Sequence, residues 1–154
     1  MNKLKMLEST DPILRKVCDP VLENELELIK DYARNMHQIM LEYKGIGLAA
    51  PQVGINKRFF IYGNENIMQL VINPEFTEKS TDDQTTIVEG CLSLPGINVD
   101  VERPKKVTMN FKNPQWKDVS MTDDDVSARV WQHEADHLDG LLIDRFIKKE
   151  DNGR

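Results

Sequence analysis

The stretch Gln132-His133-Glu134-Ala135-Asp136-His137 places two histidines four residues apart, with a glutamate directly after the first. In a helix, residues at positions i and i+4 lie on the same face, so both imidazoles can bind one metal ion. Glu134 then remains free to accept and donate a proton. The chain contains 3 histidines in all, and two of them fall in this motif. The sequence therefore predicts a central helix that binds a metal ion.

The motif leaves the third metal ligand open. A catalytic site of the zinc type needs three protein ligands and one position open to water. In zincin-type metallopeptidases the third ligand follows the second histidine, but here Ile143 stands where that pattern demands another histidine. The later candidates are Asp144 and Glu150. We therefore expect the third ligand to come from upstream.

Two cysteines are available upstream, Cys18 and Cys91. Cys18 follows Leu14 and Val17 in an apolar segment and is predicted to be a small buried side chain. Cys91 lies in residues 88–96, where glycines and a proline favour a sharp bend. A thiolate in such a loop suits a divalent metal ion, so Cys91 is the preferred candidate.

A glycine-rich segment, Gly45-Ile46-Gly47-Leu48-Ala49-Ala50-Pro51-Gln52, follows a predicted helix. Its alternating glycines allow the backbone of a ligand to approach closely. The Gln52 amide offers two N–H donors that can stabilise a developing oxyanion. No Gly-Lys-Ser/Thr follows, which excludes a phosphate-binding loop. By itself, such a segment is commonly only the C-terminal cap of a helix.

Apolar periodicity predicts a helix over residues 23–44 and several short strands. The apolar stripe of the helix is formed by Leu26, Ile29, Ala33, Met36, Met40 and Tyr43. The strand-like runs are residues 58–62, 69–72, 97–101, 106–111 and 116–121. Strands so short and so closely spaced indicate mostly antiparallel sheet, and hence an α+β fold.

The helix that carries the two histidines is predicted to begin at Thr122 and to end at about Leu138, before Gly140. The carboxylates of residues 123–125 would then lie in its first turn, where they favour the positive end of the helix dipole. Val126, Val130 and Leu138 are predicted to pack inward beside the histidines. Residues 141–143 (Leu-Leu-Ile) indicate a last strand.

Length and charge bound the class of protein. A chain of 154 residues is large enough for one core, and we expect residues 1–154 to form a single catalytic domain. A net charge of −6 argues against a surface that binds nucleic acid. No apolar run suggests a signal peptide or a transmembrane span. With 2 cysteines and no signal peptide, we expect a cytoplasmic protein without membrane partners.

Three segments together resemble the motifs of the peptide deformylase family. They are residues 45–52, Glu89-Gly90-Cys91-Leu92-Ser93, and the stretch from Gln132 to His137. They occur in the family's order with similar separations, and the resemblance extends from about residue 5 to about residue 147. It implies hydrolysis of the formyl group from the N-terminal formyl-methionine of nascent peptides, with release of formate.

The resemblance also implies roles for individual residues. Cys91, His133 and His137 would hold one divalent metal ion, commonly Fe²⁺, with Zn²⁺, Ni²⁺ or Co²⁺ possible in purified protein. Glu134 would transfer the proton. The Gln52 amide and the Leu92 backbone N–H would stabilise the oxyanion. The residues expected to bind substrate are Gly45, Ile46, Gly47, Gly90 and Val130.

The chain departs from the family pattern at two places. Asn98 stands where members often carry arginine or tyrosine, near the outer part of the substrate groove. The chain also ends soon after Ile147, whereas many bacterial members continue into a long helix that docks on the ribosome. The resemblance is thus to short forms such as those of some phages, and we expect only weak, transient contact with the ribosome.

Two other functions remain open at the level of sequence. A zincin-type metallopeptidase would need a third ligand after His137. A binding module with a structural zinc would need a fourth protein ligand and no exchangeable water.

Overall fold

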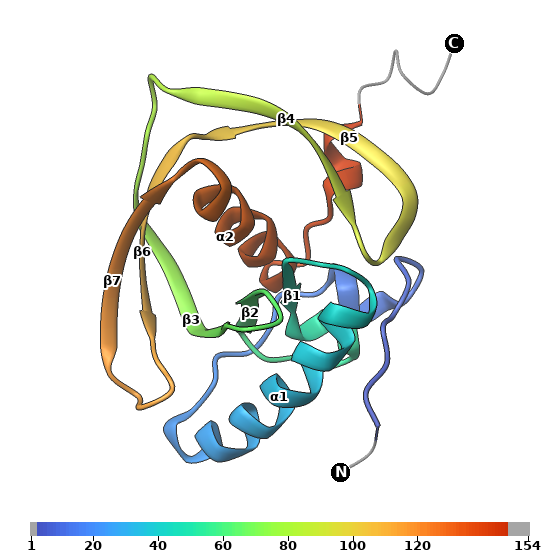
Figure 1. Ribbon diagram of the computed structural model, residues 1–154, viewed down its shortest axis with the longest axis vertical. Helices are drawn as coiled ribbons and strands as arrows, with labels where there is room; N and C mark the ends of the chain where they lie inside the picture. Colours follow the sequence, from blue (N-terminus) through green and yellow to red (C-terminus); the bar gives the residue numbers. More distant parts are fainter. Residues whose placement is uncertain (1–2, 148–154) are drawn as a thin grey trace.

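The computed structural model describes residues 3–147 and has an α+β fold, as predicted (Figure 1). Helix α1 (Leu26–Glu42) buries Ile29, Ala33, Met36 and Met40, which confirms most of the predicted stripe. A short 3-10 turn, Glu23–Glu25, precedes it where the sequence predicted regular helix. Tyr43 is 50% exposed and not part of the stripe, because the helix has already ended.

The strands form two antiparallel sheets. The larger has the order β1-β2-β3-β6-β7, and its strands are β1 (Gly47–Ala49), β2 (Phe59–Gly63), β3 (Met68–Lys79), β6 (Lys106–Lys112) and β7 (Asp118–Asp124). The smaller consists of β4 (Gln84–Cys91) and β5 (Leu94–Pro104). The five predicted strand-like runs all fall in or overlap these strands, whereas β1 and β4 were not predicted. The sheets therefore leave one edge of β1 and one edge of β4 unpaired.

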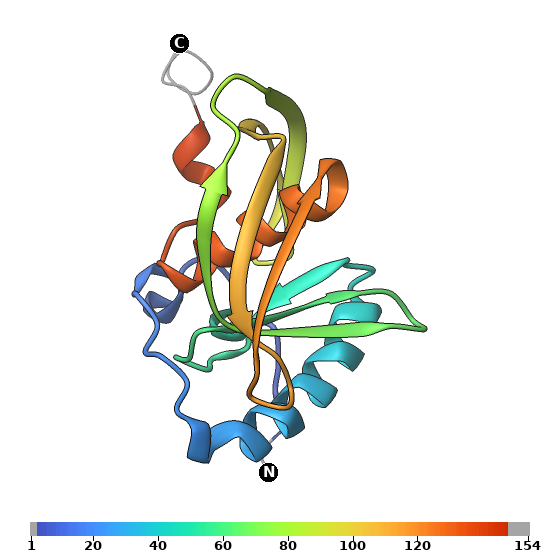
Figure 2. The same cartoon turned by 90° about the vertical axis from the view of Figure 1, so that its left-hand side faces the viewer.

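The buried strand β2 shows how the layers are arranged. Phe59 and Ile61 pack into a cluster with α1, whereas Phe60, between them, packs with Trp131 and Leu138 on the other face. Successive residues of a strand point to opposite faces, so both faces of this sheet are covered by a helix. Figures 1 and 2 show α1 and the second helix, α2 (Asp125–Leu138), on either side of β1 and β2.

The start of α2 differs from the prediction. Thr122 is not the N-cap: it lies in β7 opposite Thr108, with the two hydroxyl oxygens 2.7 Å apart. The strand continues to Asp124, which is the N-cap, so only Asp125 of the acidic run lies in the first turn. Val126 is 68% exposed and does not pack inward, whereas Val130 and Leu138 are buried as predicted. Pairing with β6 prevails here over the local capping signal.

The predicted last strand over residues 141–143 is also wrong. A 3-10 turn, Ile143–Phe146, follows α2, and Leu142 and Ile143 are buried against Leu14 of the first 3-10 turn, Pro12–Arg15. Residue 150 and the chain end, on which the expectations about a late ligand and ribosome contact rest, lie outside the described residues. Within the described part, no helix is long and apolar enough to cross a membrane.

Candidate metal centre and substrate pocket

Three residues from distant parts of the sequence meet beside α2. Cys91 ends β4, and His133 and His137 lie one turn apart in α2. One potential ligand atom of each residue lies within 4.8 Å of those of the other two. Cys91 Sγ is 3.5 Å from His137 Nε2. The structure thus brings together the three side chains that the sequence singled out as metal ligands.

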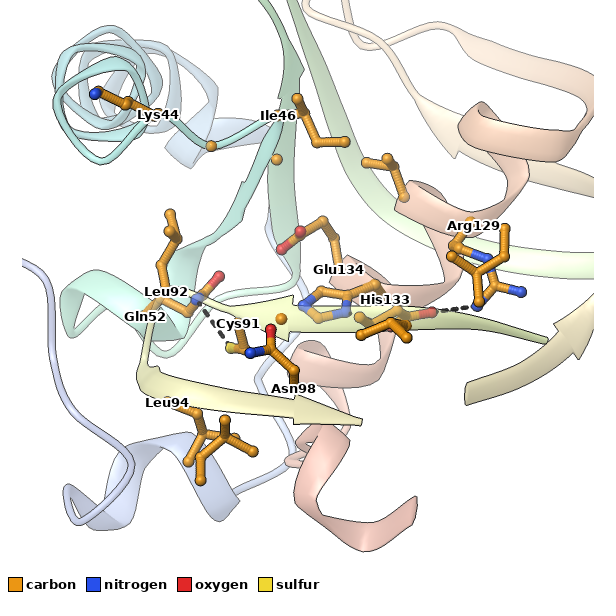
Figure 3. A pocket seen from close by; sticks show the side chains of 18 of the residues that line it. Lys44, Ile46, Gln52, Cys91, Leu92, Leu94, Asn98, Arg129, His133 and Glu134 are labelled. Carbon is orange, nitrogen blue, oxygen red and sulfur yellow. Dashed lines mark hydrogen bonds and ion pairs between the residues drawn. The ribbon is translucent and has the colours of Figure 1, made fainter. Parts of the chain in front are cut away.

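Local backbone geometry presents Cys91 to the helix. β4 and β5 pair in register from Gln84↔Pro104 to Gly90↔Asn98, and the register then shifts so that Cys91 lies opposite Leu94. This irregularity closes the hairpin with a tight turn at Leu92 and Ser93. An irregularity of this kind redirects a side chain at the end of a ladder. It accounts for a thiol that lies within reach of His137 of α2. Figure 3 shows Cys91 between Gln52 and His133.

Glu89 fixes the orientation of His133. The Glu89 Oε1 atom is 2.8 Å from His133 Nδ1, which leaves Nε2 for the centre of the cluster. Burial raises the pKa of Glu89, but hydrogen bonds from His133 and Arg103 outweigh burial and lower it to about 2. Burial lowers the pKa of His133, but its bonds to Cys91 and Glu89 outweigh burial and raise it to about 10. The negative charge of Glu89 and of a Cys91 thiolate that would favour a proton on the His133 imidazole would also favour a metal cation bound to it.

The chemistry of the donor set fits a divalent cation. Burial and the charge of His133 hold the pKa of His137 well below its usual value, so His137 is neutral, the form in which histidine binds metals. A carboxylate behind a ligating histidine, as Glu89 is behind His133, is the common arrangement in metal sites. Among residues 3–147, no fourth His, Cys, Asp or Glu joins the cluster. Three donors match a catalytic centre better than a closed structural zinc.

Glu134 is a buried carboxyl beside this cluster. Its side chain lines the pocket, and its Oε1 atom is buried without a hydrogen-bond partner among the described residues. Burial raises the pKa of Glu134 to about 7, although the charge of His133 opposes the rise. A buried carboxyl with a raised pKa and no structural partner is suited to proton transfer near neutral pH.

Gln52 is held so that its N–H groups face the cluster. Its Oε1 atom accepts a hydrogen bond from the Ala49 backbone N–H at 2.9 Å. Its Nε2 atom lies 3.8 Å from Cys91 Sγ and 3.3 Å from Ser93 Oγ. The short 3-10 turn that carries it, Ala50–Val53, follows β1 directly. The amide donors therefore lie next to the thiol, as the dashed line in Figure 3 shows.

A pocket of about 600 Å³ opens over these groups. It is lined by the remaining predicted site residues, namely Gly45, Ile46, Gly47, Gly90, Leu92 and Val130. Its lining comes from Gly47 of β1, from both strands of the β4–β5 hairpin and from α2, and β1 and β4 are both edge strands of their sheets. His137 is the only predicted site residue that lies behind this lining, at the cluster itself.

Comparison with known proteins identifies the family. A family model described as Polypeptide deformylase matches residues 3–152. The chain belongs to the peptide deformylase family. A peptide deformylase of Carboxydothermus hydrogenoformans is 40% identical over 149 residues, covering 96% of this chain and 93% of that protein.

Solved structures of peptide deformylases also resemble this chain. The crystal structure of peptide deformylase from Thermotoga maritima has a TM-score of 0.89 and 39% identity, covering 96% of this chain and 99% of that one. A class I type b peptide deformylase from Acinetobacter baumannii, crystallised with Met-Ala-Ser bound, has a TM-score of 0.88 and 35% identity, covering 94% and 98%. These matches confirm the family, the enzyme class and the α+β fold predicted from the sequence. The two alternative functions are not favoured.

Some residues of the deformylase site were not predicted. Val126 and Arg129 line the pocket together with Val130 and His133. These four positions are spaced as i, i+3, i+4 and i+7 along α2, which is one helical face. This spacing could have identified Arg129 and Val126 as residues on the same helix face as His133. Behind this face, Arg103 Nη1 donates a hydrogen bond to Asp136 Oδ2 at 2.9 Å.

Proposed function

We propose that this chain hydrolyses the formyl group of N-terminal formyl-methionine in nascent peptides, using the cluster of Cys91, His133 and His137. One observation carries the proposal: two imidazoles and one thiol form a cluster, and Cys91, His133 and the buried, unpaired carboxyl of Glu134 line one pocket beside it. Because nascent chains are made in the cytoplasm, we place the protein there as well.

The three donors would hold one divalent metal ion, which supplies Lewis acidity that activates water and polarises the formyl carbonyl. One thiolate and two imidazoles accept Fe²⁺, Zn²⁺, Ni²⁺ and Co²⁺, so the donor set does not select among them. The resemblance of the motifs to deformylases favours Fe²⁺. Oxidation of the single thiolate donor, Cys91, would damage the centre directly.

Glu134 is the proposed proton carrier. Its carboxylate takes a proton from water as the water oxygen forms a bond to the formyl carbon. It then delivers this proton to the amine nitrogen as the C–N bond breaks, so that formate and a free N-terminal amine leave. Glu134 lines the pocket, and its Oε1 atom has no hydrogen-bond partner among the described residues, so no structural bond competes with the two transfers.

Gln52 and Leu92 are the proposed oxyanion donors. As the formyl carbon becomes tetrahedral, negative charge develops on its oxygen. The Gln52 Nε2 atom is pre-oriented by the bond that its carbonyl accepts from Ala49. The Leu92 backbone N–H lies in the turn directly after Cys91. Donors fixed in advance stabilise such charge without the cost of reorientation.

The two unpaired strand edges suggest how the peptide binds. An extended peptide that enters between β1 and β4 can pair with Gly47 on one side and Gly90 on the other. The Ile46 carbonyl already accepts a hydrogen bond from the Gly63 N–H at 3.0 Å. We therefore propose that Ile46 binds the substrate through its backbone N–H. Val130 and the exposed Ile46 side chain would contact the methionine. Asn98, opposite Gly90, also lines the pocket.

Replacing Gly47 with alanine is expected to lower kcat by about 10²-fold, the cost of misplacing a catalytic group by about 1 Å. A Cβ atom at Gly47 would lie 2.7 Å from Glu134 Oε2 and would displace that carboxyl. The three atoms nearest to the new methyl group all belong to Glu134 and none to a metal donor, so bound metal should stay at the wild-type level. Steady-state kinetics and metal analysis of the same preparation measure both. Unchanged kcat in the alanine variant would show that this contact does not position Glu134.

Replacing Gln52 with leucine is expected to lower kcat by about 10²–10³-fold, the usual loss for one oxyanion donor. The size of the side chain is kept while its N–H donors are removed, and KM should change much less. Steady-state kinetics with a formylated tripeptide distinguish the two effects. A large rise in KM with unchanged kcat would make Gln52 a substrate-binding residue instead.

The substrate assignment is tested with formyl-Met-Ala-Ser and Met-Ala-Ser as paired substrates. We expect formate from the first, and no peptide cleavage in either. Free formate is measured enzymatically, and the peptides are followed by mass spectrometry. Cleavage of an internal peptide bond would support the metallopeptidase instead, and absence of any product from metal-loaded protein would contradict the proposed function.

A further inference from the structure

The proposed metal donors come from two elements, α2 and the β4–β5 hairpin, whose apolar side chains belong to separate hydrophobic clusters. The apolar side chains of α2, among them Trp131 and Leu138, pack with the large sheet. Those of the β4–β5 hairpin, including Val99 and Val101, pack with Leu14 and the turn after α2. The hairpin contributes Cys91, and α2 contributes the two histidines. Apolar packing thus holds each element mainly to its own neighbours. The hydrogen bonds between α2 and the hairpin include Gln132 Nε2 to the Pro104 carbonyl and Arg103 Nη1 to Asp136, each at 2.9 Å.

Arg129 of α2 forms polar contacts across the interface with the β4–β5 hairpin. Its Nη1 atom donates to the Glu89 carboxylate in β4 and to the Val101 carbonyl in β5, the latter at 3.0 Å. Its Nη2 atom donates to the Thr85 carbonyl at 2.8 Å and to the Thr85 hydroxyl at 3.0 Å. One side chain of α2 thus binds both strands of the hairpin. Its side chain is 11% exposed, so water competes little for these bonds.

Glu89 connects Arg129 to the metal donors. Its carboxylate accepts bonds from Arg129, from Arg103 and, at 2.8 Å, from the His133 ring. Arg129, together with Arg103, therefore holds the carboxylate that orients His133, and Arg129 also binds Thr85 in the strand that ends in Cys91. Figure 3 shows Arg129 beside His133, on the side away from Cys91.

We propose that Arg129 is a positioning residue that keeps the Cys91 hairpin in register with the histidines of α2 and thereby sets how long the metal ion is retained. The proposal rests on the metal site proposed above. Arg129 does not contact the metal in this account. Its planar fork reaches two strands at once, which a lysine ammonium cannot reproduce.

The test uses Co²⁺-loaded full-length protein and follows loss of the thiolate–Co²⁺ absorption after addition of excess EDTA. Arg129→Met removes the fork and Arg129→Lys keeps only the charge. The matched control is Arg58→Met, because Arg58 binds the other end of α2, donating to the Leu138 carbonyl and to Asp139, each at 2.9 Å. Thermal unfolding of the metal-free proteins reports stability separately.

We expect release of Co²⁺ to be about 10–100-fold faster in Arg129→Met, the usual effect of losing a residue behind a metal ligand. Arg129→Lys should lie between this variant and wild type, and Arg58→Met should match wild type. Wild-type release from Arg129→Met, or equal acceleration by Arg58→Met, would overturn the proposal. If Arg129→Met does not fold, wild-type release from Arg129→Lys overturns it instead.

Cys91→Ser separates this inference from the metal site on which it rests. Loss of the absorption band in Cys91→Ser, with unchanged release in Arg129→Met, would refute only the role of Arg129. An unchanged band in Cys91→Ser would refute the metal site itself.

Discussion

Replacing Glu134 with glutamine is expected to reduce kcat by about 10²–10⁴-fold, the contribution of a positioned general acid–base group. The substitution keeps the size of the side chain and removes the proton-accepting carboxylate. Because Cys91, His133 and His137 are unchanged, the variant should bind one metal ion as wild type does. Metal analysis and formate release from the same preparation measure the two properties separately.

The control for this prediction is Glu78→Gln, which makes the same chemical change at an exposed position of β3. This variant should keep full activity. Turnover near the wild-type level in Glu134→Gln would exclude Glu134 as the proton carrier. Loss of metal in the same variant would show instead that Glu134 supports the metal centre.

Replacing Cys91 with serine is expected to lower metal affinity and activity together. A hydroxyl is a poorer donor than a thiolate, and the Lewis acidity of the metal contributes several kcal/mol to such hydrolyses. Loss of that contribution corresponds to a fall in kcat/KM on the order of 10³-fold or more. Equilibrium dialysis with Co²⁺, together with formate release at limiting metal, measures both losses.

Cys18→Ser is the matched control for this loss. Cys18 is 3% exposed and packs with α2 and the large sheet, away from the pocket. Burial raises the pKa of the Cys18 thiol to about 11, so Cys18 remains a neutral thiol. Its replacement should affect stability and leave metal binding intact. Equal metal affinity in Cys91→Ser and wild type would remove Cys91 from the donor set.

The parts of the fold that could be predicted are those with a strong local pattern. The stripe of α1 follows from spacing alone, and β6 alternates between buried and exposed positions over nearly its whole length. β4 was not predicted because it has an unpaired edge beside the pocket and exposes Ile87 and Val88 in succession, which breaks alternation. The three residues of β1 are too few to show any periodicity.

Where the sequence was misleading, long-range contacts decide the structure. Thr122 carries a good capping signal, but the pairing of β7 with β6 extends through it to Asp124. Leu142 and Ile143 have the composition of a strand, but they are buried against the first 3-10 turn. Thr122 pairs with Thr108 in the preceding strand, and Leu142 and Ile143 pack against Leu14 at the other end of the chain, so both partners lie outside the window of a local pattern.

The site was more predictable than the fold, because its chemistry restricts the residue types. Two histidines at i and i+4 and a cysteine in a glycine-rich turn are the donors that the structure brings within 4.8 Å. The charged interface between α2 and the β4–β5 hairpin was less predictable. The spacing places Arg129 on the same helix face as His133, but nothing in the sequence shows that its guanidinium binds both strands of the β4–β5 hairpin.

The most direct test of the account is titration of metal-free protein with Co²⁺ under anaerobic conditions, with formate release from formyl-Met-Ala-Ser measured at each step. If Cys91, His133 and His137 form one catalytic site, activity should be absent without metal and should rise linearly to a break at one equivalent. The absorption of the thiolate–Co²⁺ bond should rise with the same break. Formate release from rigorously metal-free protein, or activity that saturates without any change in that absorption, would contradict the account.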